Sequence, residues 1–150
     1  MDQDGNVTER LRPSGLRFET EVRVRWSDLD AFGHVNNART LTLLEEARVD
    51  WLFIAAADHG VDKLTDGIVV ARVAVDYRRA IGFGPPVTVS MWVSALGSAS
   101  VTIDYDVRAD GRTAVLASTV LVPVDPATFR PRRLDPAERA YLKRFVGNRV

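Results

Sequence analysis

Apolar and polar residues alternate in several stretches of the chain, and the first stretch is the most regular. From Leu16 to Trp26, one face carries mainly apolar residues and every intervening position is Arg or Glu. A period of two with one charged face is typical of a half-buried β-strand. Four later stretches repeat this period and predict further strands at residues 69–77, 87–93, 101–107 and 114–122. The last of them is apolar on both faces, as expected of a central strand.

After the first strand the spacing of apolar residues changes from two to three and four. The residues that set this spacing are Leu41, Leu44, Ala47, Trp51, Leu52 and Ala55. They predict a helix of about five turns that begins at Asn37 and ends before His59-Gly60. Asn36 or Asn37 is the expected N-cap. Apolar residues fall on more than one side of this helix, so we expect it to be largely enclosed.

Turn signals and polar stretches define the remaining organisation. Asp110-Gly111 matches a type I′ hairpin turn, which joins two of the predicted strands. Residues 136–146 predict a short C-terminal helix with Asp135 as its N-cap. Residues 1–15 are polar, and we expect a flexible N-terminal arm there, followed by one domain over residues 16–150.

The order of elements is one strand, one long helix and four strands joined by short turns. This order predicts an α+β fold in which a mainly antiparallel five-stranded sheet wraps around the helix. Such a sheet leaves an edge strand and part of the helix uncovered. We therefore expect the chain to form a homo-oligomer.

Composition narrows the functional classes. The 150 residues are 46% hydrophobic, and 20 Lys and Arg balance 20 Asp and Glu, which disfavours nucleic-acid binding. There is no cysteine and there are two histidines, so we expect neither a metal site nor a cofactor. No apolar run is long enough to cross a membrane, and residues 1–5 lack the pattern of a signal peptide. We expect a cytoplasmic globular protein.

The segment between the first strand and the helix concentrates chemistry-bearing residues. Residues 26–37 contain two carboxylates, an imidazole, two amides and a glycine. A helix N-terminus offers free N–H groups and a partial positive charge to an oxyanion. A carboxylate such as Asp30, seven residues before Asn37, is suited to attack a carbonyl or to activate water against it. From residue types alone, the alternative is that these side chains merely cap the helix and satisfy loop amides.

Several motifs in this region and beyond it resemble one known family. The main one is Asp28-x-Asp30-x-x-Gly33-His34-Val35-Asn36-Asn37, followed by Leu43-Leu44-Glu45-Glu46-Ala47-Arg48. Two later ones are Val75-Asp-Tyr-Arg-Arg79 and Leu96-Gly97-Ser98-x-Ser100. Together, in this order and from about Phe18 to Pro123, they resemble the hotdog-fold thioesterases of the 4-hydroxybenzoyl-CoA thioesterase type.

This resemblance implies a homodimeric or homotetrameric hotdog protein that hydrolyses an acyl-CoA to a free acid and a thiol. Asp30 falls on the family's catalytic aspartate, which acts as nucleophile or general base. The resemblance also implies that backbone N–H groups near Asn36 and Asn37 polarise the thioester carbonyl. Gly33 and Asn36 are expected to bind substrate, and a partner subunit is expected to complete the pocket.

Other residues of these motifs have two interpretations. The His-Val-Asn-Asn run also resembles acyl-carrier-protein thioesterases, in which the loop His is catalytic, but Phe32 stands where those enzymes have Asn. His34 is thus either catalytic or a structural residue of the loop, and Asp28 is expected to organise the loop. A non-catalytic hotdog protein that binds an acyl thioester or a lipid is the functional alternative.

Three arginines are candidates for the phosphates of coenzyme A. They are Arg72, Arg78 and Arg79, for which surface ion pairing is the alternative. If residues 68–79 form one strand, Arg72 and Arg78 share a face and Arg79 does not.

Overall fold

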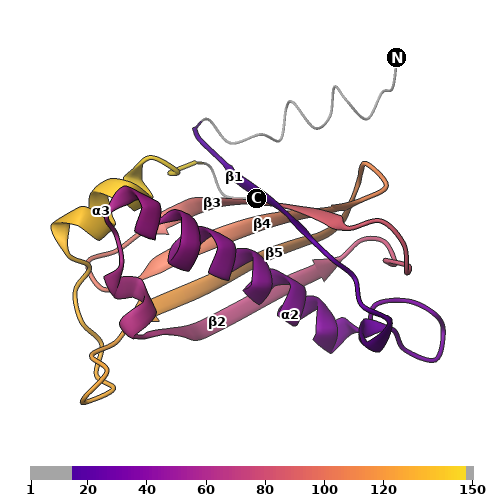
Figure 1. Cartoon of the computed structure of the whole chain (residues 1–150), viewed down its shortest axis with the longest axis horizontal. Coiled ribbons are helices and arrows are strands. Elements are labelled where there is room, and N and C mark those ends of the chain that lie inside the picture. The colour runs from indigo at the N-terminus through magenta and orange to yellow at the C-terminus, as the bar shows by residue number, and fades with distance from the viewer. Residues whose placement is uncertain (1–14, 148–150) are drawn as a thin grey trace.

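The computed structural model describes residues 15–147. The predicted arm over residues 1–15 lies, apart from Gly15, outside the described residues. Five strands form one antiparallel sheet, in the spatial order β1-β3-β4-β5-β2 (Figure 1). Their bounds are β1 Phe18–Val22, β2 Ile68–Tyr77, β3 Val87–Leu96, β4 Val101–Ala109 and β5 Arg112–Pro123. The predicted five-stranded antiparallel sheet is confirmed.

The first strand is shorter than predicted. It pairs with β3 from Phe18 opposite Met91 to Val22 opposite Val87, and this pairing ends where β3 begins. The chain then turns through a short 3₁₀ helix, Trp26–Asp28. Val24 stays buried after the pairing has ended, so the alternation of the sequence continues beyond the strand itself.

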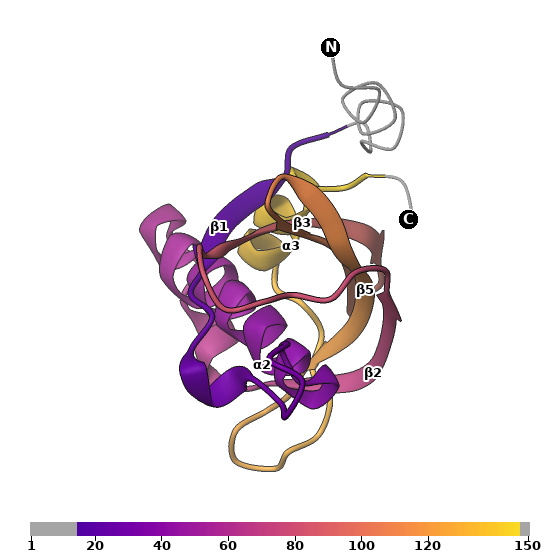
Figure 2. The same cartoon turned by 90° about the vertical axis from the view of Figure 1, so that its right-hand side faces the viewer.

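The long helix lies inside the curve of the sheet. It consists of α2, Asn37–Arg48, continued by a π-helical stretch, Val49–Ala55, and a 3₁₀ turn, Ala57–His59, so its predicted extent is confirmed. The sheet curls around it (Figure 2), and the apolar core fills the space between them. The helix is enclosed where it faces the sheet, whereas Leu41 and Ile54 are exposed. Within the described residues, no helix is long and apolar enough to cross a membrane.

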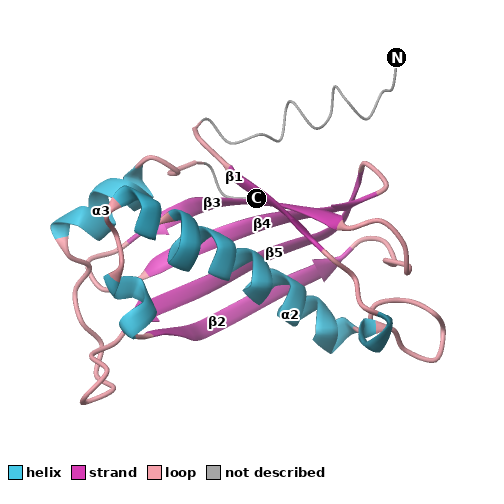
Figure 3. Ribbon diagram, viewed as in Figure 1, coloured by secondary structure: helices cyan, strands magenta, loops and turns pink. Residues whose placement is uncertain are grey.

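A second helix, α3 (Pro136–Lys143), closes one end of the sheet, and the motif loop before α2 lies at the other end (Figure 3). Tyr141 and Leu142 are buried, and the Phe145 ring contacts the Trp51 ring edge-on at 4.9 Å. The predicted N-cap is confirmed because Asp135 Oδ1 accepts from the N–H of Glu138 at 2.8 Å. The helix ends at Lys143, three residues earlier than predicted, because the segment after it turns along β3.

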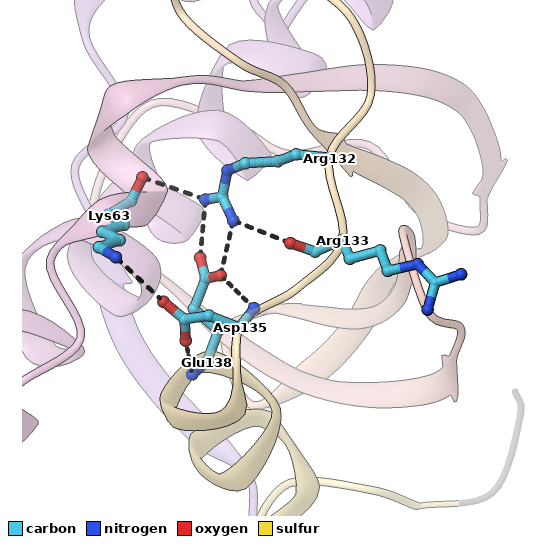
Figure 4. Close-up of polar contacts among 5 residues, drawn as sticks. All are labelled: Lys63, Arg132, Arg133, Asp135 and Glu138. Atoms are coloured by element: carbon cyan, nitrogen blue, oxygen red, sulfur yellow. Dashed lines mark hydrogen bonds and ion pairs between the residues drawn. The ribbon is translucent and has the colours of Figure 1, made fainter.

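An ion pair holds the start of α3 in place (Figure 4). The Arg132 guanidinium donates to both carboxylate oxygens of Glu138, at 2.7 and 2.9 Å, and Glu138 is 1% exposed. These hydrogen bonds raise the pKa of Arg132. Arg132 also donates to the carbonyl oxygen of Lys63, so the pair ties α3 to the segment before β2.

The two edges of the sheet differ. β1 pairs with β3 only as far as Met91, and the C-terminal segment pairs with the same edge of β3 at Val93. The Val93 N–H donates to the Phe145 carbonyl, and the Gly147 N–H donates to the Val93 carbonyl. The other edge, β2, pairs with β5 on one side, and the described residues leave its other side open. Val69, Val70 and Val73 are exposed along it.

Candidate active site

The loop between β1 and α2 folds back on itself. Leu29 bridges to Val35, and the Asp30 N–H donates to the His34 carbonyl at 2.8 Å. Gly33 makes the turn possible with φ = 78°, a conformation that glycine adopts without strain. The loop thereby brings Asp30 back beside the start of α2.

Asp28 and Asp30 lie two residues apart but differ in burial and in their contacts. Asp28 is buried, and its Oδ2 accepts from the N–H of Arg25 at 2.8 Å, while its carbonyl accepts from the N–H of Asn36. These contacts lie within the loop and agree with the predicted organising role of Asp28. Asp30 is partly exposed and faces a cavity.

The Asp30 carboxylate is held by one oxygen. Its Oδ1 accepts from the N–H groups of Phe32, at 2.9 Å, and His34, at 3.3 Å. Among the residues that the structure describes, Oδ2 has no hydrogen-bond donor. One oxygen therefore orients the group, and the other is left for a substrate or a water molecule.

The start of α2 lies beside this carboxylate. The Asn36 side chain caps the helix by accepting from the N–H of Ala38 at 2.8 Å. The Asn36 N–H was expected to help polarise a thioester, but it already donates to the Asp28 carbonyl at 2.9 Å. The Asn37 N–H has no acceptor in the part of the chain described, so Asn37 alone remains of the two predicted donors.

A cavity of ≈ 280 Å³ joins these groups. The predicted site residues that line it are Asp30, His34, Asn37, Arg78 and Arg79. Gly33 and Asn36 support it from the loop but do not line it. Residues 15–147 hold no cluster of three or more His, Asp or Glu side chains suited to a metal ion.

The three arginines are not arranged by strand alternation. β2 ends at Tyr77, and the N–H groups of both Arg78 and Arg79 donate to the Ala114 carbonyl. The predicted split of Arg78 and Arg79 between two faces required one strand over residues 68–79, and this condition is not met, because both residues lie beyond β2 and both line the cavity. Arg72 lies within β2, opposite Val120, and does not line the cavity.

One residue of the site was not predicted. The Tyr77 hydroxyl donates to the Asn37 carbonyl at 2.7 Å, and its side chain lines the cavity. Tyr77 thus fixes the first residue of α2 from the end of β2. The sequence marked Tyr77 as the last alternating position of its strand, but nothing in it placed that position opposite a helix start 40 residues away.

Comparison with known proteins identifies the family. The profile described as "Thioesterase-like superfamily" matches residues 24–145, which include both the motif loop and α3. The chain belongs to the thioesterase-like superfamily. The predictions of a hotdog fold and of a thioester hydrolase are confirmed at this level, whereas the 4-hydroxybenzoyl-CoA type stays a prediction.

The chain is also similar to several proteins of known name. The chain is 28% identical over 131 residues to the long-chain acyl-CoA thioesterase FadM of Escherichia coli, covering 86% of this chain and 99% of that one. A Thermus thermophilus thioesterase solved with coenzyme A and Zn is 34% identical, with a TM-score of 0.69, covering 83% and 90%. A predicted thioesterase from Bacillus stearothermophilus is 26% identical, with a TM-score of 0.76, covering 90% and 100%.

Proposed function

We propose that this protein hydrolyses acyl thioesters of coenzyme A, with Asp30 as the reacting carboxylate and the Asn37 N–H as the oxyanion donor. The observation that carries the proposal is that Asp30 and Asn37 line one cavity, each with a group that has no partner among the described residues. A helix start adds a partial positive charge where the negative charge develops.

The reaction follows from these two groups. The Asn37 N–H donates to the thioester carbonyl oxygen and stabilises the negative charge that forms there. In one route, Asp30 Oδ2 takes a proton from water and the resulting hydroxide attacks the carbonyl carbon. The C–S bond then breaks, and the departing sulfur takes the proton back from Asp30 to leave as the thiol. In the other, Oδ2 attacks the carbon itself, the thiolate leaves, and water then hydrolyses the mixed anhydride.

Labelled water distinguishes the two routes. A single turnover in oxygen-18 water, followed by mass spectrometry of the peptide that contains Asp30, measures whether the label enters the side chain. Label in Asp30 requires a covalent intermediate in which water attacked the aspartyl carbon. With no label in Asp30 and none of the anhydride trapped by hydroxylamine, the general-base route stands.

Two observations favour coenzyme A over a carrier protein. The E. coli relative is named an acyl-CoA thioesterase, and the T. thermophilus relative was solved with coenzyme A. In this chain, Arg78 and Arg79 line the cavity and offer donors to a phosphate. His34 lines it as well, and its backbone N–H and carbonyl both bond to Asp30, so its loop role is visible while a proton-transfer role stays a prediction.

The test is thiol release from short, branched, aromatic and long acyl-CoAs. We expect turnover of at least one of them, and a loss of at least about 100-fold in kcat for Asp30→Asn, the size typical of a general base. Asp58→Asn, an exposed aspartate at the far end of the long helix, is the matched control. Full activity of Asp30→Asn would overturn the assignment, and acyl-CoA binding without turnover would favour the non-catalytic alternative.

Self-association is the second part of the proposal. We infer that two copies pair along β2, because this edge is open among the described residues and carries the exposed Val69, Val70 and Val73. Light scattering should give the mass of a dimer or a multiple of it, and Val73→Lys should shift it toward the monomer. A monomeric wild-type protein at micromolar concentration would contradict the inference.

A further inference from the structure

The cavity at Asp30 is small and ends against buried apolar side chains. At ≈ 280 Å³ it lies below the range of roughly 300–1,000 Å³ that pockets for drug-sized ligands occupy. Val35, Ile81 and Val115 line it, and all three are buried. The Val35 N–H donates to the Ile81 carbonyl at 2.7 Å, so two of these residues are fixed to each other. The cavity therefore offers a small apolar surface beside the reacting carboxylate.

On the helix side, the cavity ends one turn into α2. Thr40 lines the cavity, whereas Leu44, which follows it on the same face of the helix, is fully buried and does not line it. Four residues span about 6 Å of helix, from the rise of about 1.5 Å per residue. A chain of carbon atoms that enters over Thr40 thus meets the Leu44 side chain after about the length of a hexanoyl group.

On the sheet side, the cavity ends in the same way. Val115, Ala117 and Thr119 are alternate residues of β5, and their buried side chains face the core. Of these three, only Val115 lines the cavity. The core behind Val115 is therefore filled, as it is behind Thr40.

A polar contact joins the helix to the sheet beyond this point. The Arg48 guanidinium, one turn after Leu44, donates to the Tyr105 hydroxyl at 3.2 Å, and this hydroxyl shares a hydrogen bond of 2.7 Å with Thr119 Oγ1. Tyr105 is fully buried in β4, and the Arg48 side chain is 12% exposed. A long acyl chain that parted α2 from the sheet here would leave buried polar groups without partners, which opposes its entry.

We propose that this protein selects short acyl groups, up to about hexanoyl, because Thr40 and Val115 line the cavity that receives them and Leu44 ends it. The inference rests on the proposed function, which places the thioester carbonyl at Asp30 and so leaves the acyl group to the apolar lining. The E. coli relative is named for long-chain acyl-CoA, so the proposed selectivity comes from the side chains of this protein. Each methylene group buried in the lining favours binding by about four-fold, and this gain stops where the lining ends.

The first test is the dependence of kcat/KM on acyl length in wild-type protein. From acetyl-CoA to butanoyl-CoA, we expect kcat/KM to rise by about four-fold per methylene group. From hexanoyl-CoA to palmitoyl-CoA, each below its micelle concentration, it should fall by at least about ten-fold, because the longer chain has to displace a packed core. A kcat/KM for palmitoyl-CoA equal to or above that for hexanoyl-CoA overturns the inference.

A deeper cavity should accept longer chains. In Val115→Ala, we expect the ratio of kcat/KM for octanoyl-CoA to kcat/KM for butanoyl-CoA to rise by about ten-fold. Val107→Ala is the matched control, since Val107 lies opposite Val115 on β4, is also buried and does not line the cavity. Both variants lose the same side-chain volume, but only the first should change the ratio. An unchanged ratio in Val115→Ala, or an equal rise in both variants, overturns the inference.

A filled cavity should accept only shorter chains. Thr40→Leu places a larger apolar side chain in the lining and loses a 3.4 Å hydrogen bond to the Asn36 carbonyl. We expect the ratio of kcat/KM for hexanoyl-CoA to kcat/KM for acetyl-CoA to fall by about ten-fold. Thr42→Leu, at an exposed position of the same helix, is the control and should leave this ratio unaltered. A wild-type ratio in Thr40→Leu contradicts the proposed selectivity.

Direct binding separates this inference from the proposed function. S-alkyl thioethers of coenzyme A have no carbonyl group to attack, so calorimetry measures how the cavity holds the chain without turnover. S-hexyl-CoA should bind wild-type protein at least about ten-fold more tightly than S-methyl-CoA, and S-dodecyl-CoA should bind more weakly than S-hexyl-CoA. If wild-type protein hydrolyses no acyl-CoA, the proposed function fails and these affinities alone decide the inference. An affinity that keeps rising through S-dodecyl-CoA, or that does not depend on chain length, overturns it.

Discussion

The two helices of this protein begin in contrasting ways. At the start of α3, Asp135 and Glu138 each accept from the backbone N–H of the other, and Arg132 binds the buried Glu138 carboxylate through two hydrogen bonds. At the start of α2, Asn36 caps a single N–H, and the neighbouring one, of Asn37, has no acceptor among residues 15–147.

The difference shows what each helix start is suited for. A helix N-terminus has several free N–H groups and must find acceptors for them. At α3 the first helical residue is Pro136, which has no N–H, and Asp135 and Glu138 bond to each other, so this helix start serves the structure. At α2 the chain supplies too few acceptors and places a cavity there instead, which leaves room for an oxygen from a substrate.

The largest effect is expected from a substitution that disrupts the start of α3. In Arg132→Ala, the 1% exposed Glu138 loses both guanidinium hydrogen bonds. Removal of one partner of a buried ion pair costs about 3–5 kcal/mol, so the free energy of unfolding in urea should fall by about 3 kcal/mol. Arg133→Ala is the control and should change it by less than about 0.5 kcal/mol. A loss below about 1 kcal/mol in Arg132→Ala would contradict this account of α3.

A smaller effect is expected from adding a negative charge at the start of α2. Asn36→Asp keeps a side-chain cap for Ala38, so the free energy of unfolding should stay within about 0.5 kcal/mol. The new carboxylate lies beside the developing oxyanion, and kcat for thiol release should fall about ten-fold, or about 1.4 kcal/mol. The converse change at α3, Asp135→Asn, should leave kcat unaltered. Equal kcat values in Asn36→Asp and wild-type protein would place the oxyanion elsewhere.

Loss of a single contact to α2 should have a still smaller effect. Tyr77→Phe removes the 2.7 Å hydrogen bond to the Asn37 carbonyl. We expect a loss of about 1 kcal/mol in the free energy of unfolding, and a few-fold lower kcat/KM because the first residue of α2 is less well fixed. Chemical denaturation and steady-state kinetics measure the two effects. Lower stability with unchanged kcat/KM would restrict Tyr77 to a structural role.

The smallest effect is expected at an exposed turn that uses the same capping chemistry as Asp30. The N–H groups of Ala127 and Thr128 donate to Asp125 Oδ1 and lower the pKa of Asp125 below its ordinary value. A lowered folded-state pKa stabilises the fold above the ordinary pKa of about 4, and this contribution is lost as the pH falls further. Below that pH, Tm should therefore fall less steeply in Asp125→Asn. Parallel Tm curves would contradict this.

Local patterns predicted most of the fold. The alternating and helical periods indicated the strands and the long helix, and Asp135 was identifiable as a cap because its contacts lie within three residues. Asp30 was singled out by its position seven residues before Asn37 and by the family resemblance, and the amides that hold it belong to Phe32 and His34.

Such local patterns could not predict features that depend on residues far apart in the sequence. The end of β1 is set by where β3 begins, and the contact of Tyr77 with Asn37 depends on how α2 lies across the sheet. The pairing of β2 with β5 likewise decides that Arg112 and Arg79 line the same cavity, which adjoins that of Asp30. Sequence spacing carries no information about these distances, because each joins elements far apart in the chain.

The docking of the C-terminal segment onto β3 gives Val93 an unusual position. Its N–H is held by Phe145 and its carbonyl by Gly147, so both hydrogen bonds depend on residues far later in the chain. Deuterium uptake at this amide would report whether the tail of the protein is seated. A chain truncated before Phe145 would exchange there rapidly and would offer a bare strand edge to other molecules, which makes this segment a determinant of solubility during preparation.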